Sequence, residues 1–164
     1  MPHKKNKSHL TAIARSDRPS LPVQWLAKRA LSPRSKILDY GCGKGADVRW
    51  LQSEGHHAAG YDPFFFPERF VLRERYEVVT CNYVINVIAS EGERVEAINS
   101  CLDALLPGGS CFVSIRSAKC IGPPGYRKQG TYQGYHPGEL RELGFNLVRR
   151  VTGYEIHRKD KEDE

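Results

Sequence analysis

The sequence predicts an α/β fold in which one domain is built around a mainly parallel sheet. Short apolar strands alternate with amphipathic helices along the chain, a glycine-rich segment follows the first strand directly, and an aspartate ends the second strand. The chain has 164 residues, of which 40% are hydrophobic and 27% charged, as expected of about one globular domain. A separate substrate-recognition domain is therefore not expected.

Residues 1–35 are expected to form a basic N-terminal arm and a helix. Nine Lys or Arg residues lie between positions 4 and 36, and Asp17 is the one acidic residue among them. The start of the arm, residues 2–8, is expected to be mobile. Apolar residues recur at helical spacing over 21–31, where Ser20 would cap the helix and Pro22 suits its first turn.

Residues 36–158 are expected to form the main domain, and residues 159–164 a charged, solvated tail. Glycine and proline residues separate the expected helices and strands. Strands are predicted at 36–40, 57–62, 76–84 and 110–116, helices at 46–54 and 91–105, a helical turn at 139–143, and a closing antiparallel hairpin at 145–151 and 154–158. Residues 63–75 leave little room for another strand and helix.

A long segment, residues 117–137, is rich in Gly, Pro and Tyr. It exceeds the usual length of a plain connection, so a binding or lid role is the first interpretation. The alternative is a mobile surface loop.

Composition excludes several classes of protein. No apolar run approaches the roughly 20 residues of a membrane helix, and no secretory signal opens the chain. The five cysteines include no Cys-x-x-Cys pair, so neither a disulfide framework nor a metal site is predicted. We therefore expect a cytoplasmic protein without membrane contact. The net charge of +6 permits nucleic acid as a partner, and the sequence makes no prediction of oligomeric state.

The main chemical signal is the segment that follows the first strand. Asp39-x-Gly41-x-Gly43-x-Gly45 places glycines where a strand turns into a helix, so that a ligand can approach the backbone. Asp62 ends the next strand, where a carboxylate can accept hydrogen bonds from a ribose. Together they predict an adenosine-containing ligand. Two alternatives remain. One is a nicotinamide cofactor, which the chain length opposes, and the other is a glycine turn that binds no ligand.

These residues, together with Pro107-Gly108-Gly109 before a strand, resemble class I S-adenosylmethionine-dependent methyltransferases over roughly residues 36–158. The resemblance implies a minimal Rossmann-like methyltransferase sheet with a reduced third strand/helix unit and a C-terminal antiparallel hairpin. It implies S-adenosyl-L-methionine as cofactor, with the glycine loop under its methionine part and the acid on its ribose. The implied cofactor-binding residues are Asp39, Tyr40, Gly41, Cys42, Gly43, Asp62, Pro63 and Asn82.

The resemblance also implies that methyl transfer takes place beside Asn82 and Tyr83, the predicted catalytic residues. Methyltransferases of exocyclic amines use an Asn/Asp-Pro-Pro-aromatic segment there, and this chain lacks both prolines, which weakens that interpretation. No Pro-Cys pair occurs, so methylation of cytosine carbon is excluded. Residues expected to bind the substrate are Arg15, Arg116, Tyr126, Lys128, Thr131 and Gln133.

A narrower resemblance is to the methyltransferase-like proteins associated with bacterial DNA phosphorothioation and to their phage relatives. Five dispersed pieces carry it in order along the chain. They are Thr11-Ala12-Ile13-x-Arg15, Asp39-Tyr40-Gly41-Cys42-Gly43-Lys44-Gly45-x-Asp47-Val48, Gly60-Tyr61-Asp62-Pro63, Asn82-Tyr83-Val84-Ile85-Asn86-Val87-Ile88 followed by Glu93-Arg94, and Gly130-Thr131-Tyr132-Gln133.

The leading functional hypothesis is a methyltransferase acting on nucleic acid or a nucleotide, with the basic arm contacting phosphate. One alternative is methylation of a small molecule, which a minimal pocket would suit. The other is a non-catalytic subunit that binds S-adenosylmethionine and works through a partner.

Overall fold

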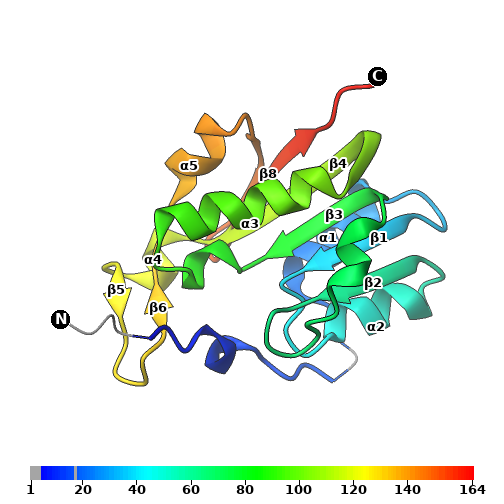
Figure 1. Cartoon of the computed structure of the whole chain (residues 1–164). Coiled ribbons are helices and arrows are strands. Elements are labelled where there is room, and N and C mark those ends of the chain that lie inside the picture. Colours follow the sequence, from blue (N-terminus) through cyan, green and yellow to red (C-terminus); the bar gives the residue numbers. More distant parts are fainter. Residues whose placement is uncertain (1–4, 17) are drawn as a thin grey trace.

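The computed structural model describes residues 5–16 and 18–164, and a six-stranded sheet forms its centre (Figure 1). The strand order is β2-β1-β3-β4-β8-β7. The first four of these strands are parallel, and β8 runs antiparallel between β4 and β7. The predicted α/β sheet with a closing antiparallel hairpin is confirmed.

The strands are β1 (Lys36–Tyr40), β2 (His57–Tyr61), β3 (Tyr76–Asn82), β4 (Leu105–Arg116), β7 (Asn146–Arg150) and β8 (Tyr154–Asp160). A separate small sheet pairs β5 (Gly125–Tyr126) with β6 (Tyr132–Gln133). The α-helices are α1 (Leu21–Arg29), α2 (Ala46–Ser53), α3 (Glu91–Asp103), α4 (Ala118–Ile121) and α5 (Pro137–Glu142). The 3-10 helices are η1 (Ser8–Thr11), η2 (Arg69–Arg73) and η3 (Ile85–Val87).

The reduced third unit is visible at the edge of the sheet. Between β2 and β3 the chain forms η2 and no further strand, so β2 is the outer strand of the sheet. Because β1 lies between β2 and β3, the chain crosses over at this point, and a crevice is expected outside the carboxyl ends of these strands.

Helices cover both faces of the sheet. On one face α3 and α5 pack through Ile98 and Leu140, and on the other α1 and α2 pack through Leu26 and Leu51, all four of which are buried. Burial of these apolar faces is the main stabilising term of such a three-layer arrangement.

Several boundaries differ from the sequence prediction; β3, for example, ends at Asn82 rather than at residue 84. Strand β4 begins at Leu105 rather than at residue 110, since Pro107-Gly108-Gly109 forms an irregularity within the strand instead of a turn before it. A Cβ at Gly109 would lie 2.9 Å from the carbonyl oxygen of Glu77, so no side chain fits there.

Strand β8 also runs to Asp160, beyond the predicted end at residue 158. The Asp160 carboxylate accepts hydrogen bonds from Ser110 Oγ at 2.6 Å and from Arg158 Nε at 2.7 Å. The first part of the expected solvated tail is therefore paired within the sheet.

The described part of the N-terminal arm is hydrogen-bonded to the rest of the chain. Lys7 N–H donates to the carbonyl of Gly130 at 3.0 Å, and the side chain of Asn6 bonds to Val87 and Tyr132. This differs from the mobility expected for residues 2–8, of which residues 2–4 lie outside the described residues. Lys4 and Asp17, both part of the predicted charge pattern, also lie outside them.

Candidate active site

A cavity of about 550 Å³ lies at the carboxyl ends of β1, β2 and β3. Its volume falls within the roughly 300–1,000 Å³ range of small-molecule sites. The glycine loop, residues 61–65 and the end of β3 form its floor, and residues of the arm between Ser8 and Arg15 form the opposite wall. In Figure 1 the arm runs across these strand ends as the dark blue segment.

The glycine loop is held against the end of β2. The backbone N–H groups of Gly41 and Cys42 donate to the carbonyl of Tyr61 at 2.7 and 3.0 Å. Gly41 has φ +75°, and a Cβ at this position would overlap the side chain of Val84. Only glycine therefore allows the loop to pass this close to the chain that follows β3.

Asp62 lies across the mouth of the loop. Its Oδ2 accepts from Gly43 N–H at 3.0 Å, and its Oδ1 accepts from the N–H groups of Phe64 and Phe65 at 2.9 and 3.0 Å. These bonds use three of about four accepting positions of a carboxylate. A contact with both hydroxyls of a ribose, as the sequence predicted, would require at least one backbone bond to yield.

Two buried aspartates lie behind the loop. Asp39 accepts from Thr80 Oγ1 at 2.9 Å, and burial, followed by the charge of Asp47, holds its pKa well above the usual value. Asp47 accepts from the backbone N–H of Ser20 at 2.6 Å and from its hydroxyl at 2.8 Å, and Arg15 lies 3.6 Å away. Asp47 thus joins the arm to the start of α2.

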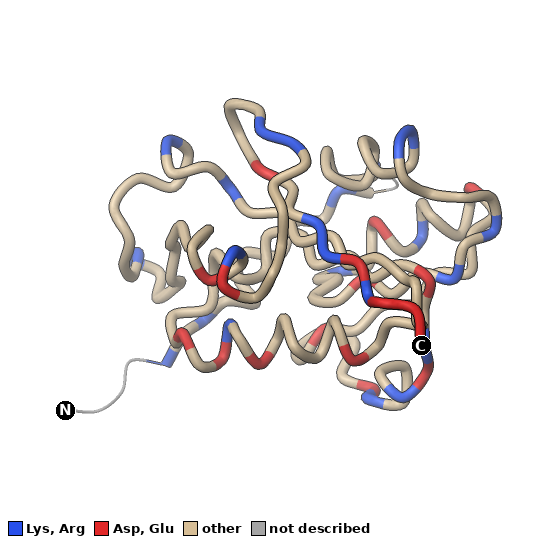
Figure 2. Tube along the Cα trace, turned by 90° about the horizontal axis from the view of Figure 1, so that it is seen from above, with Lys and Arg blue, Asp and Glu red and all other residues tan. Residues whose placement is uncertain are grey.

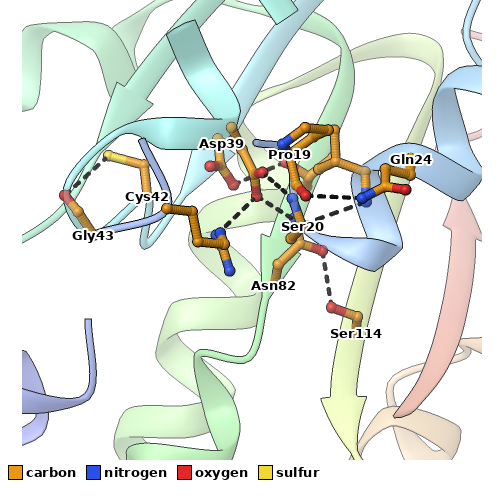
Figure 3. A network of polar contacts seen from close by, with 12 residues as sticks. Pro19, Ser20, Gln24, Asp39, Cys42, Gly43, Asn82 and Ser114 are labelled. Carbon is orange, nitrogen blue, oxygen red and sulfur yellow. Dashed lines mark hydrogen bonds and ion pairs between the residues drawn. The ribbon is translucent and has the colours of Figure 1, made fainter. Parts of the chain in front are cut away.

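Asn82 ends β3 beside the cavity. Ser114 Oγ donates to Asn82 Oδ1 at 2.9 Å, as Figure 3 shows, and Asn82 Nδ2 is buried without a partner among the described residues. An unpaired buried donor costs roughly 1–3 kcal/mol of stability, a penalty that native structures rarely carry without reason.

Tyr83 follows with φ +60°, a left-handed backbone that is strained for a non-glycine residue. Its N–H donates to the carbonyl of Ser114 at 2.9 Å, which fixes the turn out of the strand. Burial raises the pKa of Tyr83 to about 12, so the phenol stays protonated at neutral pH and offers an O–H donor.

The other predicted cofactor residues also line the cavity: Tyr40, Cys42 and Pro63. Burial raises the pKa of Tyr40. Burial, and then the neighbouring charges of Asp39 and Asp62, raises the pKa of the Cys42 thiol. Both side chains therefore remain neutral at physiological pH.

The predicted substrate residues divide into two sets. Arg15, Arg116 and Gln133 line the cavity. Three others do not line it: Tyr126, Lys128 and Thr131. Lys128 is exposed, Thr131 is buried, and the ring of Tyr126 packs edge-on against Tyr132 within the small hairpin.

Sequence reasoning assigned no role to several residues of the site. Asn86 is buried, donates to Gly134 O at 2.8 Å and accepts from Arg116 N–H at 2.9 Å, so it fixes the strand end that carries Arg116. Its one sequence signal was its place in the motif after β3. His9 stacks on Phe64 at 4.1 Å between ring centroids and also lines the cavity, with no local signal in the sequence.

Several solved structures share this fold. The 1,6-didemethyltoxoflavin-N1-methyltransferase of Burkholderia thailandensis, with its substrate and S-adenosylhomocysteine bound, is 17% identical and covers 87% of this chain and 78% of its own, with a TM-score of 0.68. The glycopeptide N-methyltransferase MtfA with S-adenosylmethionine is 14% identical, with 92% and 99% covered and a TM-score of 0.62. Magnesium protoporphyrin IX methyltransferase of Synechocystis PCC 6803 is 17% identical, with 85% and 76% covered and a TM-score of 0.56.

At these identities the similarity shows the Rossmann-like methyltransferase fold alone. The substrates named above are those of the other proteins. No curated protein sequence matches this chain at a significant level. The described residues contain no helix long and apolar enough to cross a membrane. The family model for the methyltransferase domain matches residues 14–142, which include the glycine loop and the ends of β2 and β3. The chain therefore belongs to the methyltransferase domain family.

Proposed function

We propose that this protein transfers a methyl group from S-adenosylmethionine to an acceptor that binds beside Asn82 and Tyr83. One observation carries the proposal. The glycine loop, the Asp62 carboxylate and the end of β3 meet around a single cavity of about 550 Å³. The donor is the one bound in structures of the same fold, either as itself or as S-adenosylhomocysteine.

The residues present fit this cofactor. The backbone of residues 41–43 would lie along its methionine part, Asp62 would face the ribose, and the unpartnered Asn82 amide offers a donor at the reacting end. When bound, the cofactor supplies a methyl group on a sulfonium, which is already activated. The chain then has to hold the acceptor in line and to exclude water.

Two parts of the chain perform these tasks. Residues 8–15 cover the cavity, and the strained turn at Tyr83 sets where the acceptor meets the end of β3. The neutral phenol of Tyr83 positions the acceptor by hydrogen bonding, because with its raised pKa the phenolate that could act as a base is scarcely formed at neutral pH.

For the acceptor we propose a nucleotide or nucleic acid. The net charge of +6 and two of the three arginines that line the cavity, Arg15 and Arg116, support this class. Figure 2 shows Lys and Arg around the whole outline of the chain, interspersed with Asp and Glu, so the contact would use local groups rather than one continuous basic face. Membership of the phosphorothioation-associated group and a cytoplasmic location, which the five free thiols support, stay proposals.

A small-molecule acceptor is the second candidate. The observation that favours it is the enclosure of the cavity by the arm, which contributes six residues from Ser8 to Arg15 to its lining. An extruded base would have to pass this wall.

Calorimetric titration with S-adenosylmethionine and S-adenosylhomocysteine, with NAD as the control ligand, tests the donor. We expect micromolar binding of the first two and none of NAD. Asp62→Ala should weaken binding by roughly 1–3 kcal/mol through the lost ribose contact, whereas Asp103→Ala, at an exposed site on α3, should have no effect. Labelled-methyl assays on nucleotides, oligonucleotides and small molecules then separate the acceptor classes. Binding without turnover on any of them would indicate a non-catalytic subunit.

A further inference from the structure

Arg116 is an exposed residue that lines the cavity at the end of β4. Its backbone N–H donates to Asn86 Oδ1 at 2.9 Å, and its guanidinium lies 5.7 Å from the centre of the Tyr83 ring. Stacking of this kind fixes the plane of a guanidinium and leaves its N–H edges available. No carboxylate lies within ion-pair distance of Arg116 in the part of the chain that the structure describes.

Arg15 brings a second, incompletely compensated charge to the same cavity. The carboxylate nearest to it is Asp47, at 3.6 Å, which already accepts two shorter hydrogen bonds from Ser20. The Arg15 side chain is 32% exposed, and its Nε has no partner among the described residues. Both guanidinium groups lie close enough to Tyr83 to act on the pKa of its phenol in the lowering direction, against the larger effect of burial.

The acidic groups of the cavity lie mostly around the glycine loop. Asp39, Asp47 and Asp62 are there, with Asp47 3.6 Å from Arg15, and Glu93 and Glu96 belong to α3. Lys44 and Arg69 also line the cavity, in the glycine loop and in η2, so Arg15 and Arg116 are the cations of its lining that lie near the strained turn at Tyr83.

We propose that the methyl acceptor carries an anionic group, a phosphate or a carboxylate, which Arg116 and Arg15 hold beside Tyr83. The proposal rests on the proposed methyl transfer and assigns the same anionic group to both candidate acceptor classes, the nucleotide and the small molecule. A planar guanidinium binds either oxyanion through two parallel N–H bonds, and its charge-assisted bonds are stronger than those to a neutral group.

Pairs of probes that differ in charge test this proposal. The protein saturated with S-adenosylhomocysteine is titrated with the four nucleoside 5′-monophosphates against the four nucleosides, and with benzoate against benzamide. We expect the anion of at least one pair to bind about tenfold more tightly than its neutral partner, as one charge-assisted interaction would give. The pair that shows the preference distinguishes a phosphate from a carboxylate.

Matched variants assign the preference to the site. The substitution Arg116→Gln should abolish the preference for the anion, and Arg116→Lys should keep part of that preference. Arg15→Gln should reduce the preference. Arg141→Gln removes the same charge at an exposed position on α5 and should leave it unchanged. Equal binding of both members of every pair, no detectable anion binding at millimolar concentration, or a preference that survives in Arg116→Gln would overturn the proposal. The same titrations without S-adenosylhomocysteine, alongside its own binding, show separately whether the proposed donor has failed.

Discussion

Two segments outside the sheet, the N-terminal arm over residues 5–16 and the long segment over residues 117–137, differ in how much each contributes to the site. The sequence predicts that the start of the arm is mobile and that the arm contacts phosphate, and it favours a binding or lid role for the long segment. In the structure six arm residues line the cavity, while the long segment contributes Gln133 alone. The segment that encloses the site is thus the one with the weaker local signal.

The long segment acts on the site indirectly, by supporting the arm. In its hairpin, the carbonyl of Gly130 accepts a hydrogen bond from Lys7 N–H, and the N–H of Tyr132 donates one to Asn6 Oδ1. Asn86 in turn holds the end of the segment through hydrogen bonds in both directions with Gly134. The comparison teaches that an unusual loop length indicates a structural task and does not say whether the task is to contact a ligand or to hold the element that does.

Removing residues 1–16 should have the largest effect on ligand binding. One wall of the cavity would be lost, and we expect the affinity for S-adenosylhomocysteine to fall about a hundredfold, or about 2.7 kcal/mol. Calorimetry measures this. The truncated chain should keep its melting temperature within a few degrees, because the arm contributes no buried core residue. Equal affinity in the two proteins would mean that the arm does not enclose the ligand.

The substitution Asp47→Ala should have the next largest effect, which is a loss of stability. It removes two buried hydrogen bonds to Ser20 and leaves the backbone N–H of that residue unsatisfied, so we expect the free energy of unfolding to fall by about 2 kcal/mol. Urea denaturation checks this, with Asp47→Asn as the variant that keeps an accepting oxygen. An unchanged midpoint would show that the bonds between Asp47 and Ser20, the N-cap of α1, do not stabilise the fold.

Asn6→Ala should have a moderate effect on ligand exchange. It removes the bonds that join the arm to Val87 and to the Tyr132 hairpin, and we expect S-adenosylhomocysteine to dissociate about fivefold faster, as one hydrogen bond of about 1 kcal/mol implies. Stopped-flow displacement measures the rate. Lys5→Ala, at an exposed neighbouring position, is the matched control. If both variants release the ligand at the wild-type rate, the hairpin does not hold the arm closed.

Lys128→Ala should have the smallest effect. Lys128 is exposed and does not line the cavity, so we expect donor affinity and methyl transfer to stay within about 0.5 kcal/mol of the unchanged protein. A clear loss of turnover would show that the long segment reaches the acceptor after all, and would reverse the comparison.

The sequence predicts the features that depend on neighbouring residues. The glycine loop, the aspartate at the end of β2 and the strands around them follow from local patterns, and the structure brings Gly43 and Asp62 within hydrogen-bond distance. The short interval between β2 and β3 also predicts the reduced edge of the sheet, because a strand and a helix need more residues than it contains.

What the sequence does not predict depends on contacts between distant residues. Asn6 meets Val87 across 81 positions and Tyr132 across 126, and neither contact leaves a periodic trace in the sequence. The same holds for Asp47 and Ser20, 27 positions apart, whose bonds place Arg15 at the site. The predicted strand was shorter than β4 for a different reason. The segment Pro107-Gly108-Gly109 is typical of a turn, but here it lies within the strand.

The half-buried thiol of Cys42 lies at a position where its reactivity matters. A thiolate is the strongest common nucleophile among side chains, and this one lies in the loop along which the proposed methyl donor would bind. Burial and the carboxylates of Asp39 and Asp62 keep it as the neutral thiol. The same carboxylates that shape the donor half of the cavity therefore also lower the reactivity of the thiol within it.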